Sequence, residues 1–447
     1  MILSKMTAMV LGLLMFAVAL GAETAAPDYA ALGKAVIEEL SASQFEKVEA
    51  QFDAKMTSAA PVSTMQNLWQ QIITQHGPFR AVTRSSVSER GQYHVVVISA
   101  QFEKGVINFT VAFDSDGKVG GFFIYTGRLG NNHPWTPPAY VNAGSFHEMP
   151  VTVGSAPYTL PGTLTMPNGQ GPFPAVALVQ GSGSHDEDET IGPNKPFKDL
   201  AWGLASRGIA VLRYVKRTQQ YPKIVHKPSF TVMEETVDDA RAAVSLLAAR
   251  PGIDPKRIYV LGHSLGGMLA PRIAQGDPQI TGIILMAGNT EHLGPALVRQ
   301  MKYIASLKGI APGQGDKSIE AAEATEQQSM SPSLKPSDTV NFMGANLPGS
   351  YLLDLRSYNP AATAASLKIP MLLLQGGRDY NVTVPNDFNV WKKALTGHSN
   401  VEFRFYPTLD HLFMTGSEPP SPRDFFTSGH VSGQVIDNIA EWVKAQR

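Results

Sequence analysis

A serine flanked by glycines directly follows an apolar segment in the middle of the chain. The apolar run is 257-RIYVL-261, and the serine is Ser264 within 262-GHSLG-266. Glycine at 262 and 266 permits a sharp turn, because a larger side chain there would collide with the neighbouring strand and helix. A strand, a tight turn and a helix in this order present a serine hydroxyl for attack. We therefore predict that Ser264 is a catalytic nucleophile.

A serine hydroxyl needs a base to remove its proton and an acid to orient that base. In folds that carry such a strand–turn–helix unit, the acid and then the histidine follow the serine along the chain. Asp379 comes directly after the apolar run 369–375 and two glycines, and His411 follows the apolar segment 401–407. We predict that Asp379 is the acid and that His411 is the base.

Other acids and histidines are weaker candidates for these two roles. Asp410 is adjacent to His411, and neighbouring side chains on an extended segment diverge. Asp354 lies in a segment that interrupts the predicted strands. Three further histidines are interpreted as surface or structural residues: His263, His398 and His430. The side chain of His263 should point away from the position of the base.

The reaction also needs two backbone N–H groups that stabilise the negative charge on the substrate oxygen. One is the amide of Leu265, directly after the nucleophile, and we assign the other to Ser182, which lies between two glycines. The acidic run 186–189 is a candidate cation site, but we expect a solvated loop rim whose carboxylates cap backbone N–H groups. The expected chemistry uses no cofactor and no metal.

Strands that would position these residues alternate with amphipathic helices, which predicts an α/β fold with a mostly parallel sheet. The region at about 290–360 shows no convincing strand and is interpreted as a helical insertion. A lid over the site is our preferred interpretation of this insertion, and a passive surface excursion is the alternative. Eight apolar runs are predicted as the strands: 148–153, 157–167, 174–180, 209–215, 257–261, 280–287, 369–375 and 401–407.

Length and composition limit the possible functions. The chain has 447 residues, which favours two domains, and its net charge of −1 gives no reason to expect a nucleic-acid partner. It has no cysteine, which excludes disulfides, thiolate metal sites and cysteine catalysis. Lys5 precedes the apolar run 8–22, and small and polar residues follow it. This pattern predicts a signal peptide over 1–22, rather than an uncleaved anchor, and an exported protein (periplasmic or extracellular) with no stable membrane anchor after cleavage.

The region before the predicted strands has a different organisation. Apolar spacing predicts helices between residues 32 and 56, and alternation predicts strands at 93–102, 105–113 and 119–127. We expect a small α+β domain over 27–127, a linker over 128–146 and the catalytic domain over 147–447. The small domain resembles cystatin-like or nuclear-transport-factor-like domains, and it could bind a polymer, mediate a homodimer or shield the catalytic domain. Four of its aromatic residues are predicted to be core: Phe109, Phe113, Phe122 and Phe123.

From about residue 147 the chain resembles the α/β-hydrolase superfamily, especially exported bacterial esterases related to dienelactone hydrolase and the catalytic domain of prolyl oligopeptidase-type peptidases. The similar motifs are 180-QGSG-183, 262-GHSLGG-267, 376-GGRD-379 and the Asp-His pair ending at His411. Many relatives have histidine where this chain has Gln180, which bears on the geometry of that loop.

The resemblance implies a serine carboxylic-ester hydrolase that forms an acyl-serine on Ser264. His411 would act as base and then as acid, and Asp379 would hold its tautomer. The expected partner is a small-molecule ester with a small to medium acyl group. A serine peptidase or amidase, a thioesterase, and a non-catalytic binding protein of the same fold remain alternatives. The region upstream is too short for a propeller, which disfavours a prolyl oligopeptidase.

Overall fold

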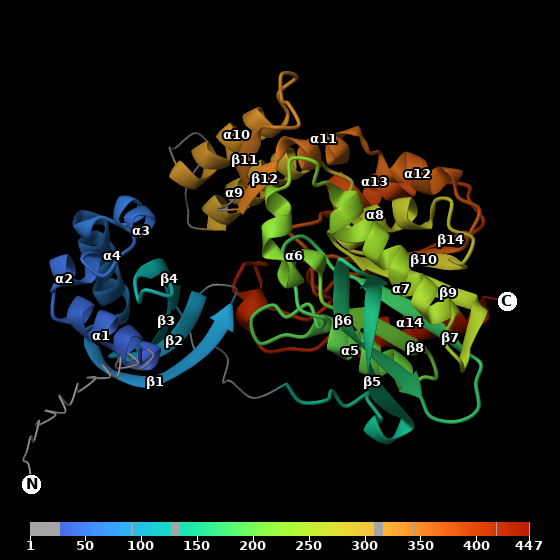
Figure 1. The fold of residues 1–447 in the computed structure, drawn as a ribbon, viewed down its shortest axis with the longest axis horizontal. Coiled ribbons are helices and arrows are strands. Elements are labelled where there is room, and N and C mark those ends of the chain that lie inside the picture. The colour runs from blue at the N-terminus through green and yellow to red at the C-terminus, as the bar shows by residue number, and fades with distance from the viewer. Residues whose placement is uncertain are drawn as a thin grey trace, which may run out of the picture. The chain divides into compact units, whose positions relative to one another are not determined.

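The computed structural model describes residues 27–90, 93–126, 135–307, 316–342, 345–416 and 418–446. The chain divides into two compact units, Met1–Arg128 and Leu129–Arg447 (Figure 1). The predicted signal peptide and residues 128–134 of the predicted linker lie outside the described residues. Within the described ranges, no helix combines the length and apolar character that crossing a bilayer requires.

The N-terminal unit packs helices against a four-stranded antiparallel sheet of order β1-β2-β3-β4. Its core lies between them, where Ile37 and Trp69 of the helices meet Ile98 and Phe109 of the sheet. The helices are α1 (Tyr29–Ser41), α2 (Phe45–Glu49), α3 (Ala54–Ala59) and α4 (Val62–His76), and the strands are β1 (Phe79–Arg90), β2 (Tyr93–Phe102), β3 (Gly105–Phe113) and β4 (Val119–Thr126).

Two elements of this unit, α4 and β1, are not among the predicted ones. The aromatic residues divide between the core and the surface. Phe109 and Phe113 are fully buried, and Phe122 packs against the core, as predicted. The prediction for Phe123 is wrong because this side chain is 56% exposed. Phe122 and Phe123 are neighbours on a strand, where successive side chains point to opposite faces, so only one of them can face the helices.

The C-terminal unit is built on an eight-stranded sheet of order β14-β13-β10-β9-β7-β8-β6-β5. Strand β6 is antiparallel to both of its neighbours, and every other neighbouring pair is parallel. The predicted mostly parallel sheet of eight strands is therefore confirmed. The strands are β5 (Phe146–Ser155), β6 (Tyr158–Pro167), β7 (Phe173–Val179), β8 (Ala210–Tyr214), β9 (Ile253–His263), β10 (Gly282–Met286), β13 (Met371–Gly376) and β14 (Val401–Tyr406).

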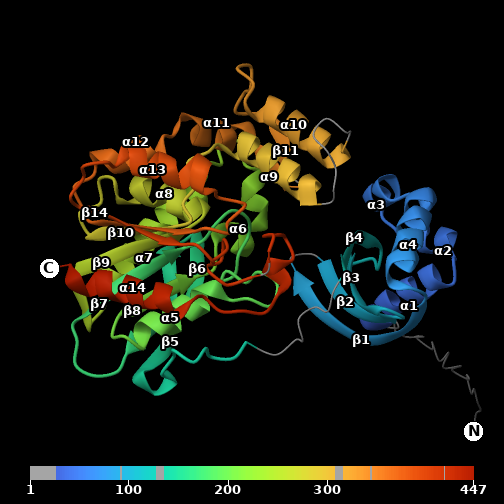
Figure 2. The same ribbon diagram turned by 180° about the vertical axis from the view of Figure 1, so that it is seen from behind.

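Helices cover both faces of this sheet because successive strand residues are buried on opposite sides. Leu178 and Tyr259 pack with α5 (Pro196–Ala205) and α14 (Gly433–Ala445) on one face. Ala177 and Val260 pack on the other face with α7 (Asp238–Ala248), α8 (Leu265–Ala274), α12 (Pro360–Ser366) and α13 (Asn389–Ala394) (Figure 2). The shorter elements are η1 (Ala143–Ser145), α6 (Arg217–Gln220), η2 (Pro222–His226), η3 (Met233–Val237), η4 (Val384–Phe388) and η5 (Asp424–Phe426).

The segment predicted as a helical insertion lies between β10 and β13. It contains α9 (Leu293–Leu307), α10 (Lys317–Ser329) and α11 (Gly349–Ser357). It also contains an antiparallel pair, β11 (Thr339–Phe342) and β12 (Ala345–Pro348), so the prediction that this segment holds no strand is wrong. Each strand has four residues, which is too short for a clear alternation of apolar and polar side chains.

Candidate active site

Ser264 stands at the sharp turn between β9 and α8, where it is the N-cap residue of the helix. Its backbone angles are φ 53° and ψ −116°, a conformation that costs a non-glycine residue about 1–3 kcal/mol. The two flanking glycines are required by space. A Cβ at Gly262 would lie 2.1 Å from the Gly266 carbonyl oxygen, and a Cβ at Gly266 would lie 2.2 Å from the Val179 carbonyl oxygen. The turn therefore presents Ser264 at the carboxyl end of a central strand.

Asp379 and His411 form a hydrogen-bonded pair at the same edge of the sheet. The imidazole Nδ1 of His411 lies 2.7 Å from Asp379 Oδ2, and the Asp379 side chain is fully buried. Asp379 Oδ1 accepts hydrogen bonds from the N–H groups of Asn381 and Val382, both at 2.9 Å. These donors hold the carboxylate in a fixed orientation. A proton on Nδ1 that is held by this carboxylate leaves Nε2 of His411 available as a base.

The turn that carries Ser264 lies beside the segment that carries His411. His263, adjacent to Ser264, has Nε2 2.9 Å from the carbonyl oxygen of His411, and the two imidazole rings are 4.7 Å apart. Among the described residues, Ser264 Oγ makes no hydrogen bond with His411. Such a contact is often long or absent without substrate.

Glu189 is a buried partner of His263, which corrects the prediction of a solvated rim. Only 1% of Glu189 is exposed; its Oε2 lies 3.0 Å from His263 Nδ1, and its Oε1 accepts the Gly181 N–H at 2.6 Å. The Glu189–His263 contact has the distance of an ion pair without the alignment of a hydrogen bond, so we attribute it to charge attraction. Asp188 is also buried, in an ion pair with Lys195 at 2.7 Å.

The charges of Glu189 and His263 stabilise each other. Burial alone would raise the pKa of Glu189, but the interactions with His263, His185 and the Gly181 N–H together outweigh burial and lower this pKa. Burial alone would lower the pKa of His263, but its interactions with Glu189, the His411 carbonyl oxygen and Asp379 together outweigh burial and raise that pKa. We infer that the pair is ionised. Within the described ranges, no cluster of three or more potential metal-binding side chains occurs.

The loop after β7 is fixed beside Ser264 through Gly181. A Cβ on this glycine would lie 3.1 Å from Ser264 Cβ, so a larger residue would require a small shift of the loop or of Ser264. Lys216 Nζ donates to the Gly181 carbonyl oxygen at 2.6 Å, and the side chain of Gln180 donates to the Tyr214 carbonyl oxygen. Gln180 thus anchors the loop in this chain. The described contacts include no hydrogen bond donated by the amides of Ser182 or Leu265.

Lys216 connects this loop to the insertion. The lysine is 2% exposed, and its Nζ lies 3.1 Å from Glu235 Oε1. Glu235 Oε2 accepts a hydrogen bond at 2.7 Å from the hydroxyl of Tyr351, which belongs to α11. A continuous buried path therefore runs from the insertion through two charged side chains to the backbone beside Ser264.

Three of the weaker candidates, Asp410, Asp354 and His430, have structural partners. Asp410 Oδ1 accepts the N–H groups of Leu412 and Met414, and so shapes its own loop. Asp354 pairs with Arg272 at 2.8 Å, and His430 Nδ1 lies 3.0 Å from Asp199 Oδ1. None of these acids contacts the imidazole of His411 within the described structure.

Sequence reasoning missed the roles of Glu189, His263 and Lys216. A signal for Lys216 exists, because a lysine that directly follows a mostly apolar strand at the functional edge of a sheet must be paired. No comparable signal marks Glu189, which lies in a strongly polar run.

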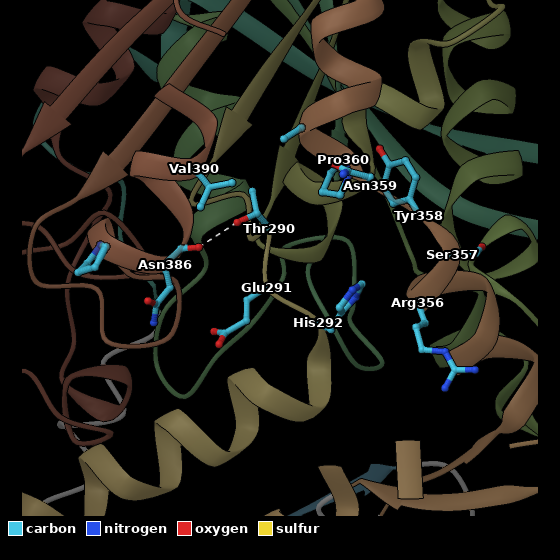
Figure 3. A pocket seen from close by; sticks show the side chains of 12 residues that line it. Thr290, Glu291, His292, Arg356, Ser357, Tyr358, Asn359, Pro360, Asn386 and Val390 are labelled. Carbon is cyan, nitrogen blue, oxygen red and sulfur yellow. Dashed lines mark hydrogen bonds between the residues drawn. The ribbon is translucent and has the colours of Figure 1, made fainter. Parts of the chain in front are cut away.

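A pocket of about 550 Å³ opens at another place on the same unit (Figure 3). It lies between the segment after β10, the junction of α11 and α12, and η4, and its lining includes His292, Arg356 and Asn386. Neither Ser264, Asp379 nor His411 lines it. We therefore do not assign this pocket to the reacting ester group.

Comparisons with known proteins place the chain in a family. Esterase EstD of Thermotoga maritima is 37% identical over 407 residues, which cover 91% of this chain and 93% of that protein. The chain belongs to the α/β-hydrolase esterases. Residues 195–418 match the family model described as serine aminopeptidase, S33, and residues 34–122 match a protein family of unknown function, DUF3887. The chain is a carboxylesterase-like hydrolase with a separate N-terminal domain.

More distant matches were also found. Esterase FrsA of Klebsiella pneumoniae subsp. pneumoniae is 30% identical over 150 residues, a third of either chain. Est1E from Butyrivibrio proteoclasticus has a TM-score of 0.43 at 16% identity, covering 66% of this chain and 98% of that one. The Pyrococcus furiosus esterase Pf2001 has a TM-score of 0.43 at 19% identity, and the match covers 70% of this chain and 94% of that one.

Proposed function

We propose that this hydrolase cleaves carboxylic esters with Ser264 as nucleophile, His411 as general base and Asp379 as the orienting acid. The observation that carries the proposal is the 2.7 Å contact between His411 Nδ1 and Asp379 Oδ2, next to the turn that presents Ser264. An imidazole held in this tautomer beside a strained, glycine-flanked serine is the arrangement that serine hydrolases need.

The proposed reaction has two steps. His411 Nε2 takes the proton of Ser264 Oγ as that oxygen bonds to the ester carbonyl carbon, and the imidazolium then returns the proton to the departing alcohol. Water next attacks the acyl-serine, with His411 again acting first as base and then as acid. The products are the carboxylic acid and the alcohol, and Ser264 is regenerated.

The negatively charged carbonyl oxygen would bind the amides of Leu265 and Ser182. A trans peptide points its C=O and its N–H in opposite directions. Because the Gly181 carbonyl oxygen binds Lys216 Nζ, the N–H of Ser182 in the same peptide points away from Lys216. The N–H of Gly181 is bound by Glu189 and is therefore not this donor, which is consistent with the proposed role of Ser182.

The substrate class is proposed as esters with small to medium acyl groups. A specific observation supports amide cleavage as a second candidate, because the matching family model is described as a serine aminopeptidase. Amides and thioesters would react through the same acyl-serine, so the attacked bond must be distinguished by assay. We further propose that the insertion acts as a lid, with α10 and the β11–β12 hairpin as its moving part.

The test is hydrolysis of p-nitrophenyl esters from acetate to laurate, beside a p-nitroanilide and a thioester, by the wild type and Ser264→Ala. We expect ester turnover with an optimum at a short or medium chain, and loss of turnover in the variant. A dominant anilide rate would favour the amidase. Equal background rates in both proteins would refute the hydrolase mechanism proposed here.

We also propose export, on the basis of the basic and apolar pattern within residues 1–22. Expression of the full chain in a bacterial host, fractionation and N-terminal sequencing would test it. A mature protein that begins close to residue 23 in the periplasm or medium is the expected result. An intact N-terminus in the cytoplasm would contradict export.

A further inference from the structure

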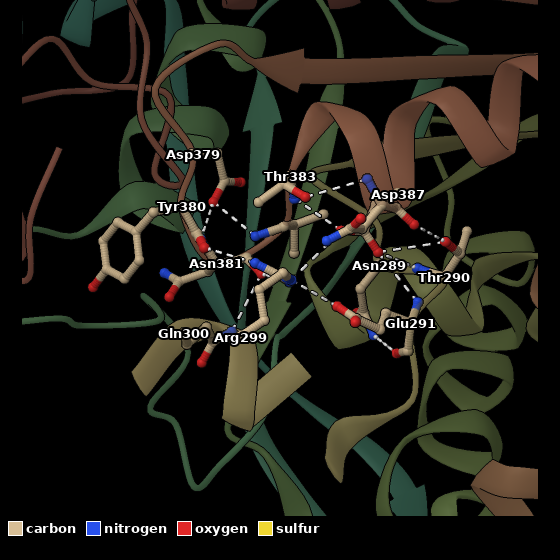
Figure 4. Close-up of polar contacts among 12 residues, drawn as sticks. Asn289, Thr290, Glu291, Arg299, Gln300, Asp379, Tyr380, Asn381, Thr383 and Asp387 are labelled. Carbon is tan, nitrogen blue, oxygen red and sulfur yellow. Dashed lines mark hydrogen bonds and ion pairs between the residues drawn. The ribbon is translucent and has the colours of Figure 1, made fainter. Parts of the chain in front are cut away.

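Arg299, on the first helix of the insertion, contacts the loop that follows Asp379. Its Nη1 donates to the Tyr380 carbonyl oxygen at 3.0 Å, and its Nη2 donates to the Asn381 carbonyl oxygen at 2.8 Å (Figure 4). Gln300, the next residue of α9, donates to the same Asn381 oxygen at 3.2 Å. One guanidinium group therefore holds two successive carbonyl groups of this loop.

The same two peptide groups also bind Asp379. The carbonyl of Tyr380 shares a peptide with the N–H of Asn381, and the carbonyl of Asn381 shares one with the N–H of Val382. Both N–H groups donate to Asp379 Oδ1 at 2.9 Å. Since the C=O and N–H of a trans peptide point in opposite directions, Arg299 and the Asp379 carboxylate bind opposite sides of two shared peptides.

Acidic neighbours hold the guanidinium group of Arg299 in turn. Its Nε donates to Glu291 Oε2 at 2.8 Å, and its Nη2 lies 4.0 Å from the buried carboxylate of Asp387. Asp387 accepts N–H groups from Thr290 at 2.8 Å and from Thr383 at 2.8 Å, so it joins the segment after β10 to the loop after β13. The guanidinium group is thus held by two carboxylates in addition to the two carbonyl groups of the Asp379 loop.

We propose that Arg299 is a positioning residue of the hydrolase, acting on Asp379 through these two peptides. The inference rests on the proposed function of Asp379 and goes beyond it, because it makes the first helix of the insertion part of the catalytic framework. Hydrogen bonds in a chain polarise one another, so a cation on the two carbonyl groups strengthens the N–H donors that hold the carboxylate. Arg299 also fixes the direction of these donors, and with them the direction of the Asp379–His411 contact.

The experiment compares full-length Arg299→Met and Arg299→Lys with Arg241→Met as a matched control. Arg241 also binds carbonyl groups, those of Arg272, Ile273 and Gln275 at the end of α8, and it makes no contact with the Asp379 loop. The readouts are kcat and KM on the best p-nitrophenyl ester, and the far-downfield proton resonance of the His411–Asp379 hydrogen bond in each folded protein.

We expect Arg299→Met to lower kcat roughly 100-fold with little change in KM, since small displacements of catalytic groups have effects of this size. Arg299→Lys can reach one carbonyl group and should recover part of the loss. The downfield resonance should shift or disappear in Arg299→Met and stay in Arg241→Met. If both methionine variants fold, an equal kcat in Arg299→Met and Arg241→Met would overturn the proposal. If Arg299→Met fails to fold, the proposal would be overturned by a wild-type kcat and a wild-type resonance in Arg299→Lys.

The two proposals fail in different ways. Absence of Ser264-dependent turnover in the wild type would refute the proposed function, and the proton resonance would still report whether Arg299 positions Asp379. Normal wild-type turnover with an unaffected Arg299→Met would refute only the positioning role.

Discussion

Lys216 Nζ lies 2.6 Å from the carbonyl oxygen of Gly181, and both residues are buried beside the turn that carries Ser264. A buried ammonium group is costly unless it is paired, and here its partners are this carbonyl group and Glu235 at 3.1 Å. The lysine thereby sets the orientation of the peptide that continues into Ser182. The ammonium group of Lys216 can in this way control the direction of the Ser182 N–H.

We predict that Lys216→Met lowers kcat roughly 100-fold, because the Ser182 amide loses its fixed direction and one donor in such a site has an effect of about this size. The variant should also be less stable by about 3–5 kcal/mol, since Glu235 becomes an unpaired buried charge. Kinetics on the best ester and urea unfolding would measure the two effects. The double variant Lys216→Met/Glu235→Met should recover stability without recovering kcat; recovery of both would contradict the orienting role.

Gly181→Ala should impair catalysis more than folding. The added Cβ would lie 3.1 Å from Ser264 Cβ and 3.2 Å from Glu189 Oε1, so we expect a small displacement between the loop and Ser264. We expect a loss of roughly tenfold or more in kcat/KM, as for other small displacements at reacting centres. Gly144→Ala is a suitable control, because its Cβ would meet only Asn142 Oδ1 at 3.6 Å. Equal activity of the two variants would argue against close packing at residue 181.

The pair of Glu189 and His263 predicts a pH-dependent contribution to stability. Because the pKa of Glu189 is lowered in the folded protein, its ionised form stabilises the fold fully above its ordinary pKa of 4.5. This stabilisation is lost as the pH falls through the lowered pKa. Because the pKa of His263 is raised in the folded protein, its protonated form stabilises the fold fully below its ordinary pKa of 6.5. This stabilisation is lost as the pH rises through the raised pKa. Both contributions are complete between these ordinary values.

Glu189→Gln should therefore reduce the free energy of unfolding by about 3 kcal/mol in this window, with a smaller reduction at higher pH. Urea unfolding of both proteins at several pH values would show it. A stability difference that grows as the pH rises would contradict an ionised pair. Asp116→Asn, at an exposed turn of the N-terminal unit, serves as the surface control.

The lid proposal can be tested by joining α10 to α9. Lys302 and Glu323 form an exposed ion pair at 2.9 Å between these helices, and the chain has no cysteine of its own. The double variant Lys302→Cys/Glu323→Cys, crosslinked with a bis-maleimide, should change the relative rates along the ester series. The uncrosslinked double variant is the control, and identical selectivity before and after crosslinking would contradict a moving α10.

The predictable part of the structure follows from local rules. The eight strands are visible as apolar runs, and the turn at Ser264 is visible from its glycines. The residues that hold the site depend on partners distant in sequence. Glu189 lies in a polar run that resembles a surface rim, and its burial becomes tolerable only because His263 arrives from β9. The β11–β12 hairpin was mispredicted because its strands are too short for a clear alternation, and Phe123 was mispredicted because two adjacent phenylalanines hide which one faces the core.

The attachment of α9 to the Asp379 loop also bears on how such enzymes can be recombined. An exchange of the whole segment between β10 and β13 with a relative would replace Arg299 and Gln300 together with the outer part of the insertion. A chimera joined after Leu307 and before Gly349 would keep α9 and Tyr351 of this chain. Only the second design separates a change of substrate preference from damage to the proposed catalytic residues.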